Sequence, residues 1–366
     1  MKSGFENTRY QTADSFEGEQ REIFSRLWIF FCLRMMVDKP HQFVARDIAG
    51  VPVVVQNMDG EPRAFRNICL HRQSKLQIED FGTRRLVCPY HGWSYGAAGE
   101  VAHIPLNDEY FQLLPSETCK MKLDSFHIAV IGQLVFVNLD PDPLPIEDQF
   151  TPALIEQLAS ASNSFDNEVL ISKQICDYDW KLIYENLRDS AHPQFLHRKT
   201  LTRDVEINLD PVPPNVSELA ARVPHLSELS GGGRLHELVH DVTPSYAPKV
   251  ERWGAEDAYF NWLLFPNTHM VSPNGGYMFS IEHHHPIGPG KTEVTIYCMT
   301  AKVKGSLPSS VLWEQMKGAK AVLDEDNDAM EDVQSVVARG PENAVLGGGE
   351  HAISALQNWI ASRVKV

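Results

Sequence analysis

The stretch from residue 69 to residue 96, CLHRQSKLQIEDFGTRRLVCPYHGWSYG, indicates both a fold and a kind of site in this chain of 366 residues. It contains a C-x-H pair, Cys69 and His71, and further along a C-x2-H pair, Cys88 and His91. Short β-rich segments punctuated by Gly and Asp surround both pairs, so we expect each pair at the tip of a hairpin in an all-β module. Two such tips can converge on one metal centre with two sulfur and two imidazole ligands.

Two kinds of metal centre use such a ligand set. A structural zinc site can hold two Cys and two His, but zinc sites of the ribbon type usually carry C-x2-C pairs. A Rieske [2Fe-2S] cluster has two Cys on one iron and two His on the other, which agrees with the interleaved order. We therefore predict a Rieske cluster on these four residues, shielded by Trp93 and Tyr95 from the same stretch.

A second group of candidate ligands lies in the segment 180–200, WKLIYENLRDSAHPQFLHRKT, where we expect a strand to lead into a helix over about 180–198. On that helix Asp189 and His192 share one face. His192 and His197 would point about 140° apart on a straight helix. Pro193 removes a backbone donor, so a local distortion can bring the two imidazoles together. Two His and one carboxylate form the facial triad of non-haem Fe(II) oxygenases.

The third ligand of such a triad is expected on a late helix over 308–338, where LDEDNDAMEDVQ (323–334) is rich in carboxylates. Helical spacing places Asp326 in register with Met330 and Val333, which we take to mark the buried face. A buried carboxylate is costly without a partner, so Asp326 is the predicted iron ligand. The other candidates are Asp324, Glu325, Asp328, Glu331 and Asp332.

Charge and hydropathy limit the function classes. The formal net charge of −15 disfavours nucleic acid as a partner. The longest clean apolar run, VPVVV at 51–55, is far shorter than the roughly 20 residues of a membrane span. The N-terminal residues lack the apolar region of a secretory signal, so we expect a cytoplasmic protein with no membrane contact. In that compartment clustered Cys favour metal ligation over disulfides.

The expected fold class is α+β. The Pro- and acid-rich segment DPDPLPIED (140–148) marks a domain boundary. We expect residues 1–39 to be an N-terminal segment of the catalytic domain, 40–148 to form the iron–sulfur domain, and 149–366 to form the catalytic mononuclear iron domain. The Pro-, Ser- and Gly-rich segment 204–235 is expected to be a long loop that can act as a lid.

The chain resembles, over nearly its whole length, the large (α) subunit of Rieske non-haem iron aromatic-ring-hydroxylating oxygenases. The C-x-H and C-x2-H pairs, the ENLRD-x2-H-x4-H segment and the late DNDAME segment occur in the order of that family. The resemblance implies a Rieske domain inserted into a catalytic domain with a central antiparallel sheet covered by helices. It also implies a homotrimer in which the cluster of one subunit lies beside the iron of its neighbour.

The resemblance also implies roles for single residues. Asp189 would bridge the two centres by a hydrogen bond to His91 of the adjacent subunit, and Asn186 would lie near the iron. The first Asp of DNDAME would be the carboxylate ligand, which again is Asp326. One departure from the family pattern is Gln73, where Gly or Ala is commoner.

By the same resemblance, electrons from NAD(P)H would arrive through a reductase, either directly or through a ferredoxin. The cluster would pass them to the iron, where O2 and a small aromatic substrate react by dihydroxylation or monooxygenation. The helix segment is most similar to enzymes for aromatic acids such as salicylate or terephthalate. The chain length leaves the presence of a small β subunit open.

Three alternatives share some of these features. An O- or N-demethylase would use every one of the predicted metal ligands and differ only in its pocket. A zinc-stabilised binding protein would have no redox role. A stand-alone Rieske electron carrier would not need the residues after 150.

We expect the substrate pocket to be mostly apolar and lined by YFNWLLF (259–265), the strands after it and the helix over 182–197.

Overall fold

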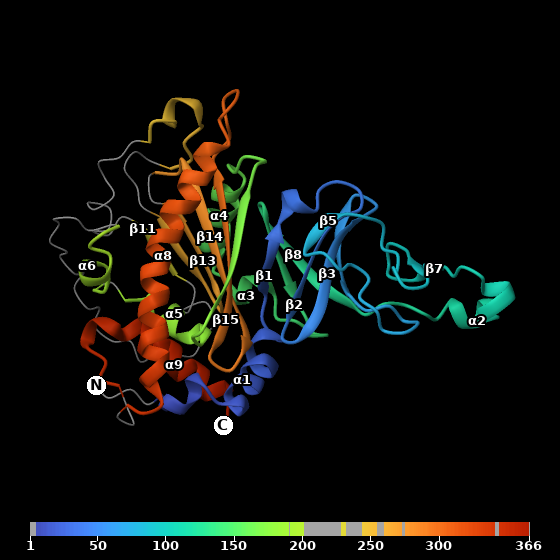
Figure 1. The fold of residues 1–366 in the computed structure, drawn as a ribbon, viewed down its shortest axis with the longest axis horizontal. Helices are drawn as coiled ribbons and strands as arrows, with labels where there is room; N and C mark the ends of the chain where they lie inside the picture. Colours follow the sequence, from blue (N-terminus) through green and yellow to red (C-terminus); the bar gives the residue numbers. More distant parts are fainter. Residues whose placement is uncertain are drawn as a thin grey trace. The chain divides into compact units, whose positions relative to one another are not determined.

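The computed structural model describes residues 5–189, 191–200, 228–231, 244–254, 260–272, 275–340 and 344–365. The chain divides into two compact units, each described here by itself (Figure 1). Unit 1 comprises Met1–Ile23 and Glu147–Val366, and unit 2 comprises Phe24–Ile146. No helix among the described residues is both long enough and apolar enough to cross a bilayer.

Unit 2 is an all-β module. Its main sheet is antiparallel and has the strand order β1-β9-β8-β4-β3-β2-β5, and β6 pairs separately with β7. β-Branched residues dominate the central strand β3, where Val53, Val54 and Val55 are buried. The elements are β1 (Ile29–Leu33), β2 (Gln42–Ile48), β3 (Val51–Met58), β4 (Glu61–Arg66), β5 (Phe81–Thr83), β6 (Ser94–Tyr95), β7 (Val101–His103), α2 (Pro115–Thr118), β8 (Ser125–Ile131) and β9 (Leu134–Asn138).

The boundaries of unit 2 differ at one end from the expected domain limits. The unit begins at Phe24, upstream of the expected limit at 40, because β1 pairs with β9. It ends at Ile146, close to the expected limit at 148. Residues 84–90, expected as a strand, are irregular apart from a bridge between Val87 and Ser94, because the backbone turns there.

Unit 1 contains a second antiparallel sheet, whose described strands run in the order β10-β15-β14-β13-β12-β11. The long helix α8 crosses one face of this sheet and packs on β10, β15 and α5 (Figure 1). A sheet with helices packed on it, together with an all-β module, confirms the expected α+β class. The strands are β10 (Leu170–Cys176), β11 (Glu228–Gly231), β12 (Phe260–Leu264), β13 (Thr268–Ser272), β14 (Met278–Gly288) and β15 (Lys291–Thr300).

The helices of unit 1 partly match the expected ones. The first helix continues as a π-helical turn over Gln20–Phe24, and the late helix expected over 308–338 appears as α8. The expected loop or lid at 204–235 lies outside the described residues, except for β11. The helices are α1 (Ala13–Glu19), α3 (Ile146–Gln149), α4 (Pro152–Ser162), α5 (Trp180–Asn186), α6 (Pro193–Leu196), α8 (Ser310–Val337) and α9 (His351–Arg363).

A buried ion pair joins α5 to the N-terminal helix α1. The Lys181 side chain has no exposure, and its Nζ lies 2.6 Å from Glu19 Oε1 and 2.7 Å from Asp179 Oδ1. Burial alone lowers the pKa of Lys181, but the two carboxylates raise it above its ordinary value, so the ammonium group stays charged. Trp180 Nε1 also donates to Glu19, at 2.8 Å. These contacts fix α5, and therefore the segment that follows it.

Replacing this lysine should destabilise the fold strongly. Lys181→Met leaves two buried carboxylates without a counter-charge, which should lower the free energy of unfolding by about 3–5 kcal/mol. Lys317→Met on α8 is the matched control, because Lys317 pairs with Glu314 at 2.8 Å on the exposed surface. The control should change the free energy of unfolding by less than about 1 kcal/mol. Urea unfolding followed by tryptophan fluorescence measures both, and equal midpoints for the two variants would contradict the assignment.

Candidate metal centres and substrate cavity

Two loops of unit 2 carry the first set of predicted ligands, and both have the same backbone hydrogen bonds. The Cys69 N–H donates to Ser74 O at 2.8 Å, and the Cys88 N–H donates to Trp93 O at 2.8 Å. Each cysteine therefore begins a tight turn that returns the chain to the position opposite it. The repeated geometry explains why a C-x-H pair and a C-x2-H pair can serve one site from two places in the sequence.

The residue four positions after each cysteine adopts a left-handed conformation. Gln73 has a φ of 57° and Gly92 a φ of 75°. Their N–H groups donate to Cys69 O at 3.0 Å and to Cys88 O at 2.9 Å. Glycine has no steric cost at such a position, whereas a residue with a Cβ does. Gln73 therefore occupies a position whose backbone conformation favours glycine.

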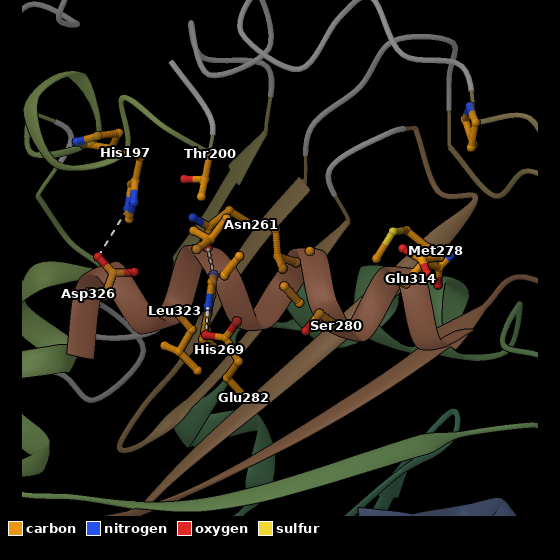
Figure 2. A pocket seen from close by; sticks show the side chains of 18 of the residues that line it. His197, Thr200, Asn261, His269, Met278, Ser280, Glu282, Glu314, Leu323 and Asp326 are labelled. Atoms are coloured by element: carbon orange, nitrogen blue, oxygen red, sulfur yellow. Dashed lines mark hydrogen bonds and ion pairs between the residues drawn. The ribbon is translucent and has the colours of Figure 1, made fainter. Parts of the chain in front are cut away.

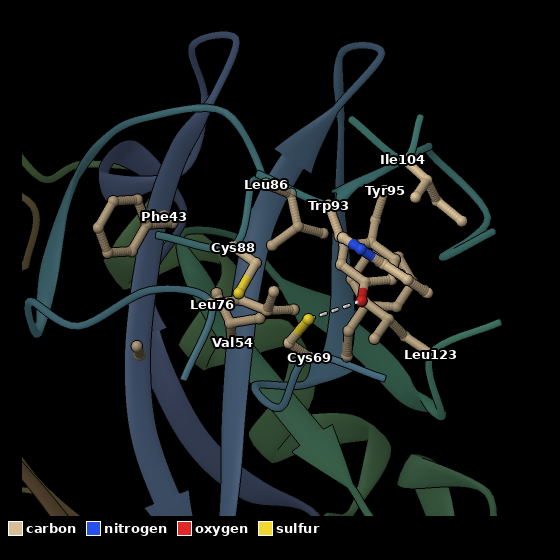
Figure 3. Packing of buried hydrophobic residues seen from close by; sticks show 12 residues of the cluster. Phe43, Val54, Cys69, Leu76, Leu86, Cys88, Trp93, Tyr95, Ile104 and Leu123 are labelled. Carbon is tan, nitrogen blue, oxygen red and sulfur yellow. Dashed lines mark hydrogen bonds between the residues drawn. The ribbon is translucent and has the colours of Figure 1, made fainter. Parts of the chain in front are cut away.

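The two thiols lie in the hydrophobic core of unit 2 (Figure 3). Cys69 and Cys88 are buried, and both are free cysteines. Burial raises the pKa of Cys69, whereas the Tyr95 hydroxyl, 3.2 Å from its Sγ, lowers it. The same hydroxyl accepts the Leu70 N–H at 2.9 Å, so Tyr95 holds the first loop against the core.

The two imidazoles lie side by side. The ring centroids of His71 and His91 are 4.5 Å apart, and Trp93 stacks on His71 at 5.1 Å with an interplanar angle of 7°. Burial and the neighbouring His91 lower the pKa of His71, which favours the neutral form that binds metals. Both Nδ1 atoms are buried without a hydrogen-bond partner in the described chain. Such atoms are rare in folded proteins, and with two buried thiols they fit the donor set of a Rieske cluster.

The expected continuous helix over 180–198 is broken in unit 1. α5 ends at Asn186, and the short helix α6 starts at Pro193, a residue tolerated only in a first turn. Asp189 Oδ1 accepts the Ala191 N–H at 2.7 Å, and its Oδ2 accepts the His192 N–H at 3.2 Å. These two hydrogen bonds hold a turn between α5 and α6, so α6 does not continue the direction of α5. The break brings both histidines to one place, which a straight helix cannot do.

Three predicted ligands converge after this break. His192 Nε2 lies 3.7 Å and His197 Nε2 lies 3.2 Å from Asp326 Oδ1, although Asp326 comes from the distant helix α8. The ligand atoms all lie within 4.8 Å of one another, so a single metal ion fits between them. Asn186 Nδ2 donates to the same Asp326 oxygen at 2.8 Å and so positions the carboxylate.

A carboxylate also orients the other nitrogen of the His197 imidazole. His197 Nδ1 donates to Glu325 Oε2 at 2.9 Å, and Thr200 Oγ1 donates to the same oxygen at 2.7 Å. His192 Nδ1 lies 3.7 Å from Asp189 Oδ2. A carboxylate that holds Nδ1 leaves Nε2 for a metal ion. The orienting role of Glu325 was missed from sequence, where its position beside Asp326 was the available sign.

The acidic candidates on α8 differ in their exposure to solvent. Asp326 is buried, whereas Asp328 and Asp332 are exposed. The predicted residue is thus the inward one, but part of the reason given for it is wrong, because Val333 is 40% exposed. Leu323 and Met316 mark the buried face instead.

A cavity of about 720 Å³ opens beside the three converging ligands (Figure 2). The sheet contributes residues from β12, β13 and β14, and helix α8 covers the opposite side. Of the expected segment 259–265, Asn261 is the described residue on the lining. The lining includes apolar residues such as Met278 and Leu323, but the polar residues Glu282 and Glu314 are also present. The cavity is therefore mostly apolar, as expected, with a few polar groups on its lining.

Comparison with known families agrees with the two units. Residues 28–126 match the Rieske [2Fe-2S] domain family. Residues 165–366, more than half of the chain, match the family described as the catalytic domain of the ring hydroxylating alpha subunit.

Individual relatives and solved structures are similar over large parts of the chain. The large oxygenase component of the naphthalene 1,2-dioxygenase system of Pseudomonas putida is 26% identical over 359 residues, which cover 86% of this chain and 76% of the relative. The oxygenase subunit of carnitine monooxygenase from Acinetobacter pittii is 26% identical over 200 residues, covering 52% of this chain and 53% of the relative.

The crystal structure of a quaternary ammonium Rieske monooxygenase with L-carnitine superposes with a TM-score of 0.77 at 19% identity, covering 100% of this chain and 96% of that one. That likeness concerns the fold. Together with the two family matches, it shows that the chain belongs to the Rieske ring-hydroxylating oxygenases, as a large (α) subunit.

Proposed function

We propose that this protein is the terminal oxygenase of a multicomponent system that hydroxylates a small aromatic substrate. O2 is the co-substrate, and electrons come from NAD(P)H through a reductase, either directly or through a ferredoxin. The observation that carries the proposal is the convergence of His192, His197 and Asp326 beside a cavity of about 720 Å³. Two His and one carboxylate with open positions are the ligand set of non-haem Fe(II) oxygenases.

In this proposal Cys69, His71, Cys88 and His91 hold the [2Fe-2S] cluster, and the converging ligands in unit 1 hold a mononuclear Fe(II). When bound, the cluster supplies single electrons and the mononuclear iron supplies the position at which O2 is activated.

The remaining tasks fall to the protein chain. Asn186 fixes the Asp326 carboxylate, Glu325 fixes the His197 ring, and Asp189 holds the His192 backbone N–H. The apolar part of the cavity, including Val271 and Leu323, excludes water from the bound ring.

The charge of the cavity bears on the class of substrate. Its lining includes the carboxylates of Asp189, Glu282 and Glu314 in addition to Asp326. Neither Lys nor Arg is among the lining residues that the structure describes. An anionic ligand therefore finds no Lys or Arg to pair with on the described lining, so this cavity favours a neutral aromatic compound over the aromatic acid suggested by the helix segment.

The test is oxygen uptake coupled to product formation, with metal-loaded protein, NADH and a surrogate reductase and ferredoxin. Naphthalene represents neutral aromatic compounds, and benzoate and terephthalate represent aromatic acids. We expect hydroxylated product from naphthalene and little from the acids. A preference for the acids would contradict the charge argument. No coupled uptake with any aromatic compound, although both metal centres are loaded, would contradict the proposed function.

A second candidate function is oxidative N-demethylation or hydroxylation of an amine. The same acidic lining favours a cationic substrate, and one relative is named for its action on carnitine. N,N-dimethylaniline and carnitine in the same assay test this candidate, because demethylation releases formaldehyde, which ring hydroxylation does not.

We further propose that the chain works as a homotrimer in which Asp189 meets His91 of the neighbouring subunit and links the two metal centres. The Asp189 side chain is 26% exposed, so it remains accessible from outside its own loop. Its oxygens also accept the N–H groups of Ala191 and His192 in the turn before α6, and a role in this turn alone would make it a structural residue.

Asp189→Asn separates these two roles. The amide oxygen can still accept the Ala191 N–H and hold the turn before α6, so both metal centres should remain loaded, but a charged link to His91 is lost. We expect the chemically reduced cluster to stay reduced when substrate and O2 are added, as followed by its visible spectrum. Asp324→Asn, on the exposed side of α8, is the control and should reoxidise normally. Normal reoxidation in Asp189→Asn would show that electrons take another route.

The two metal sites should be separable by mutation. Asp326→Ala should lose the mononuclear iron and all hydroxylation but keep the Rieske spectrum, because it removes a buried ligand of unit 1 only. Cys69→Ser should show the opposite pattern, with the cluster spectrum lost and the mononuclear iron retained.

Iron and acid-labile sulfide analysis with visible and EPR spectra measures both variants. Asp324→Ala and Asp328→Ala are controls that should keep their iron. Retention of the iron by Asp326→Ala together with its loss from Asp324→Ala would reverse the ligand assignment.

A further inference from the structure

Three polar residues on neighbouring strands form one wall of the cavity (Figure 2). Asn261 lies on β12, His269 on β13 and Glu282 on β14. His269 and Glu282 are direct cross-strand partners, and His269 also faces Leu263, two residues from Asn261. Because side chains alternate along a strand, this register puts all three on the same face of the sheet. These three residues are called the polar wall below.

The polar wall is a continuous chain of hydrogen bonds. His269 Nδ1 lies 2.9 Å from Glu282 Oε2, and His269 Nε2 lies 2.9 Å from Asn261 Oδ1. A carboxylate and an amide oxygen only accept hydrogen bonds, so both ring nitrogens of His269 act as donors. Glu282 thus orients the His269 ring, and the ring orients the Asn261 amide.

The charge state of the wall is consistent with its surroundings. Burial raises the pKa of Glu282, but His269 lowers it overall, so the carboxylate is ionised. The neighbouring His284 has its Nε2 3.9 Å from Glu282 and no exposure. Burial lowers the pKa of His284 to about 4, so His284 is neutral beside the carboxylate.

This arrangement determines what Asn261 offers to a ligand. Its oxygen is occupied by His269, and its amide nitrogen donates to no described residue, while the residue itself lines the cavity. Two N–H groups therefore remain for a ligand in the cavity. His269 and Glu282 hold the amide in this orientation, because the opposite orientation would place N–H groups against the N–H of His269.

We propose that Asn261 is a hydrogen-bond donor subsite that binds a neutral oxygen acceptor of the substrate, such as a ketone, amide or ether oxygen. Binding there fixes which ring atoms face His192, His197 and Asp326, so the orienting role rests on the proposed oxygenase function. A carboxylate is a poorer occupant, since Glu282 and Glu314 also line the cavity. A purely structural pair of His269 and Glu282 would stabilise the sheet without any effect on ligand preference.

The test compares two ligands of equal carbon skeleton, 1-acetylnaphthalene and 1-ethylnaphthalene, which differ in one carbonyl oxygen. Equilibrium binding to the metal-loaded protein, without reductase, measures affinity independently of turnover. One hydrogen bond should make the ketone bind about fivefold more tightly. Asn261→Leu, of similar size but without donors, should abolish this preference and leave affinity for 1-ethylnaphthalene within about twofold.

Two further variants test whether the preference for the ketone depends on Asn261 itself. Asn261→Asp keeps an acceptor for His269 and replaces the donor, so it should also lose the preference even where the leucine variant folds poorly. Ser280→Ala removes another polar group of the cavity lining and should retain the preference. Equal affinities in the wild type, or a preference that survives in Asn261→Asp, would overturn the subsite.

Turnover gives a separate readout. With reductase present, Asn261→Leu should hydroxylate 1-acetylnaphthalene at a wider mixture of ring positions than the wild type. A wild type that prefers the ketone in binding but turns over no aromatic compound would overturn the oxygenase proposal and leave the subsite standing. A wild type that oxidises naphthalene but binds both probes with equal affinity would overturn the subsite and leave the oxygenase proposal standing.

Discussion

The buried charge of Lys181 is the constraint on which the catalytic unit depends. An ammonium group without exposure is tolerated because Glu19 and Asp179 lie within 2.7 Å of it. The pair fixes α5 against the N-terminal helix, and the C-terminal end of α5 then delivers Asn186 to Asp326. A residue far from the cavity thus determines where the metal ligands can meet.

Both metal centres use the same physical means to position ligands, namely backbone turns held by hydrogen bonds. In unit 2 each cysteine starts a turn that closes on a left-handed residue, Gln73 or Gly92. In unit 1 the carboxylate of Asp189 accepts the N–H groups of Ala191 and His192 and so holds the turn that follows α5. Turns suit this purpose because they aim neighbouring side chains in directions that a regular helix or strand forbids.

The cavity combines an apolar helix side with a polar sheet side. On the sheet, the buried Glu282 carboxylate orients His269, and His269 orients Asn261, so one carboxylate sets the hydrogen-bonding character of the wall. On the other side, the apolar face of α8 carries the single buried carboxylate that faces the histidines. The proposed donor subsite therefore lies on the sheet side of the cavity, and the candidate carboxylate ligand lies on α8.

The sequence by itself determined the ligand types. Cys69, His71, Cys88 and His91 occur as short-range pairs, and a pair spaced by one or two residues must lie in one turn whatever the rest of the fold. Local spacing also identified His192, His197 and the helix that bears Asp326. The exposure of Val333 shows that helical periodicity selected that carboxylate on partly mistaken grounds.

Tertiary structure alone decided the rest. The break after Asn186 depends on which backbone groups Asp189 can reach, and Glu325 gained its role only when α8 packed beside His197. The polar wall exists because sheet register places three strands side by side, and no local pattern specifies register between strands. Contacts within a turn follow from spacing, whereas contacts between strands and helices follow from how the whole chain packs.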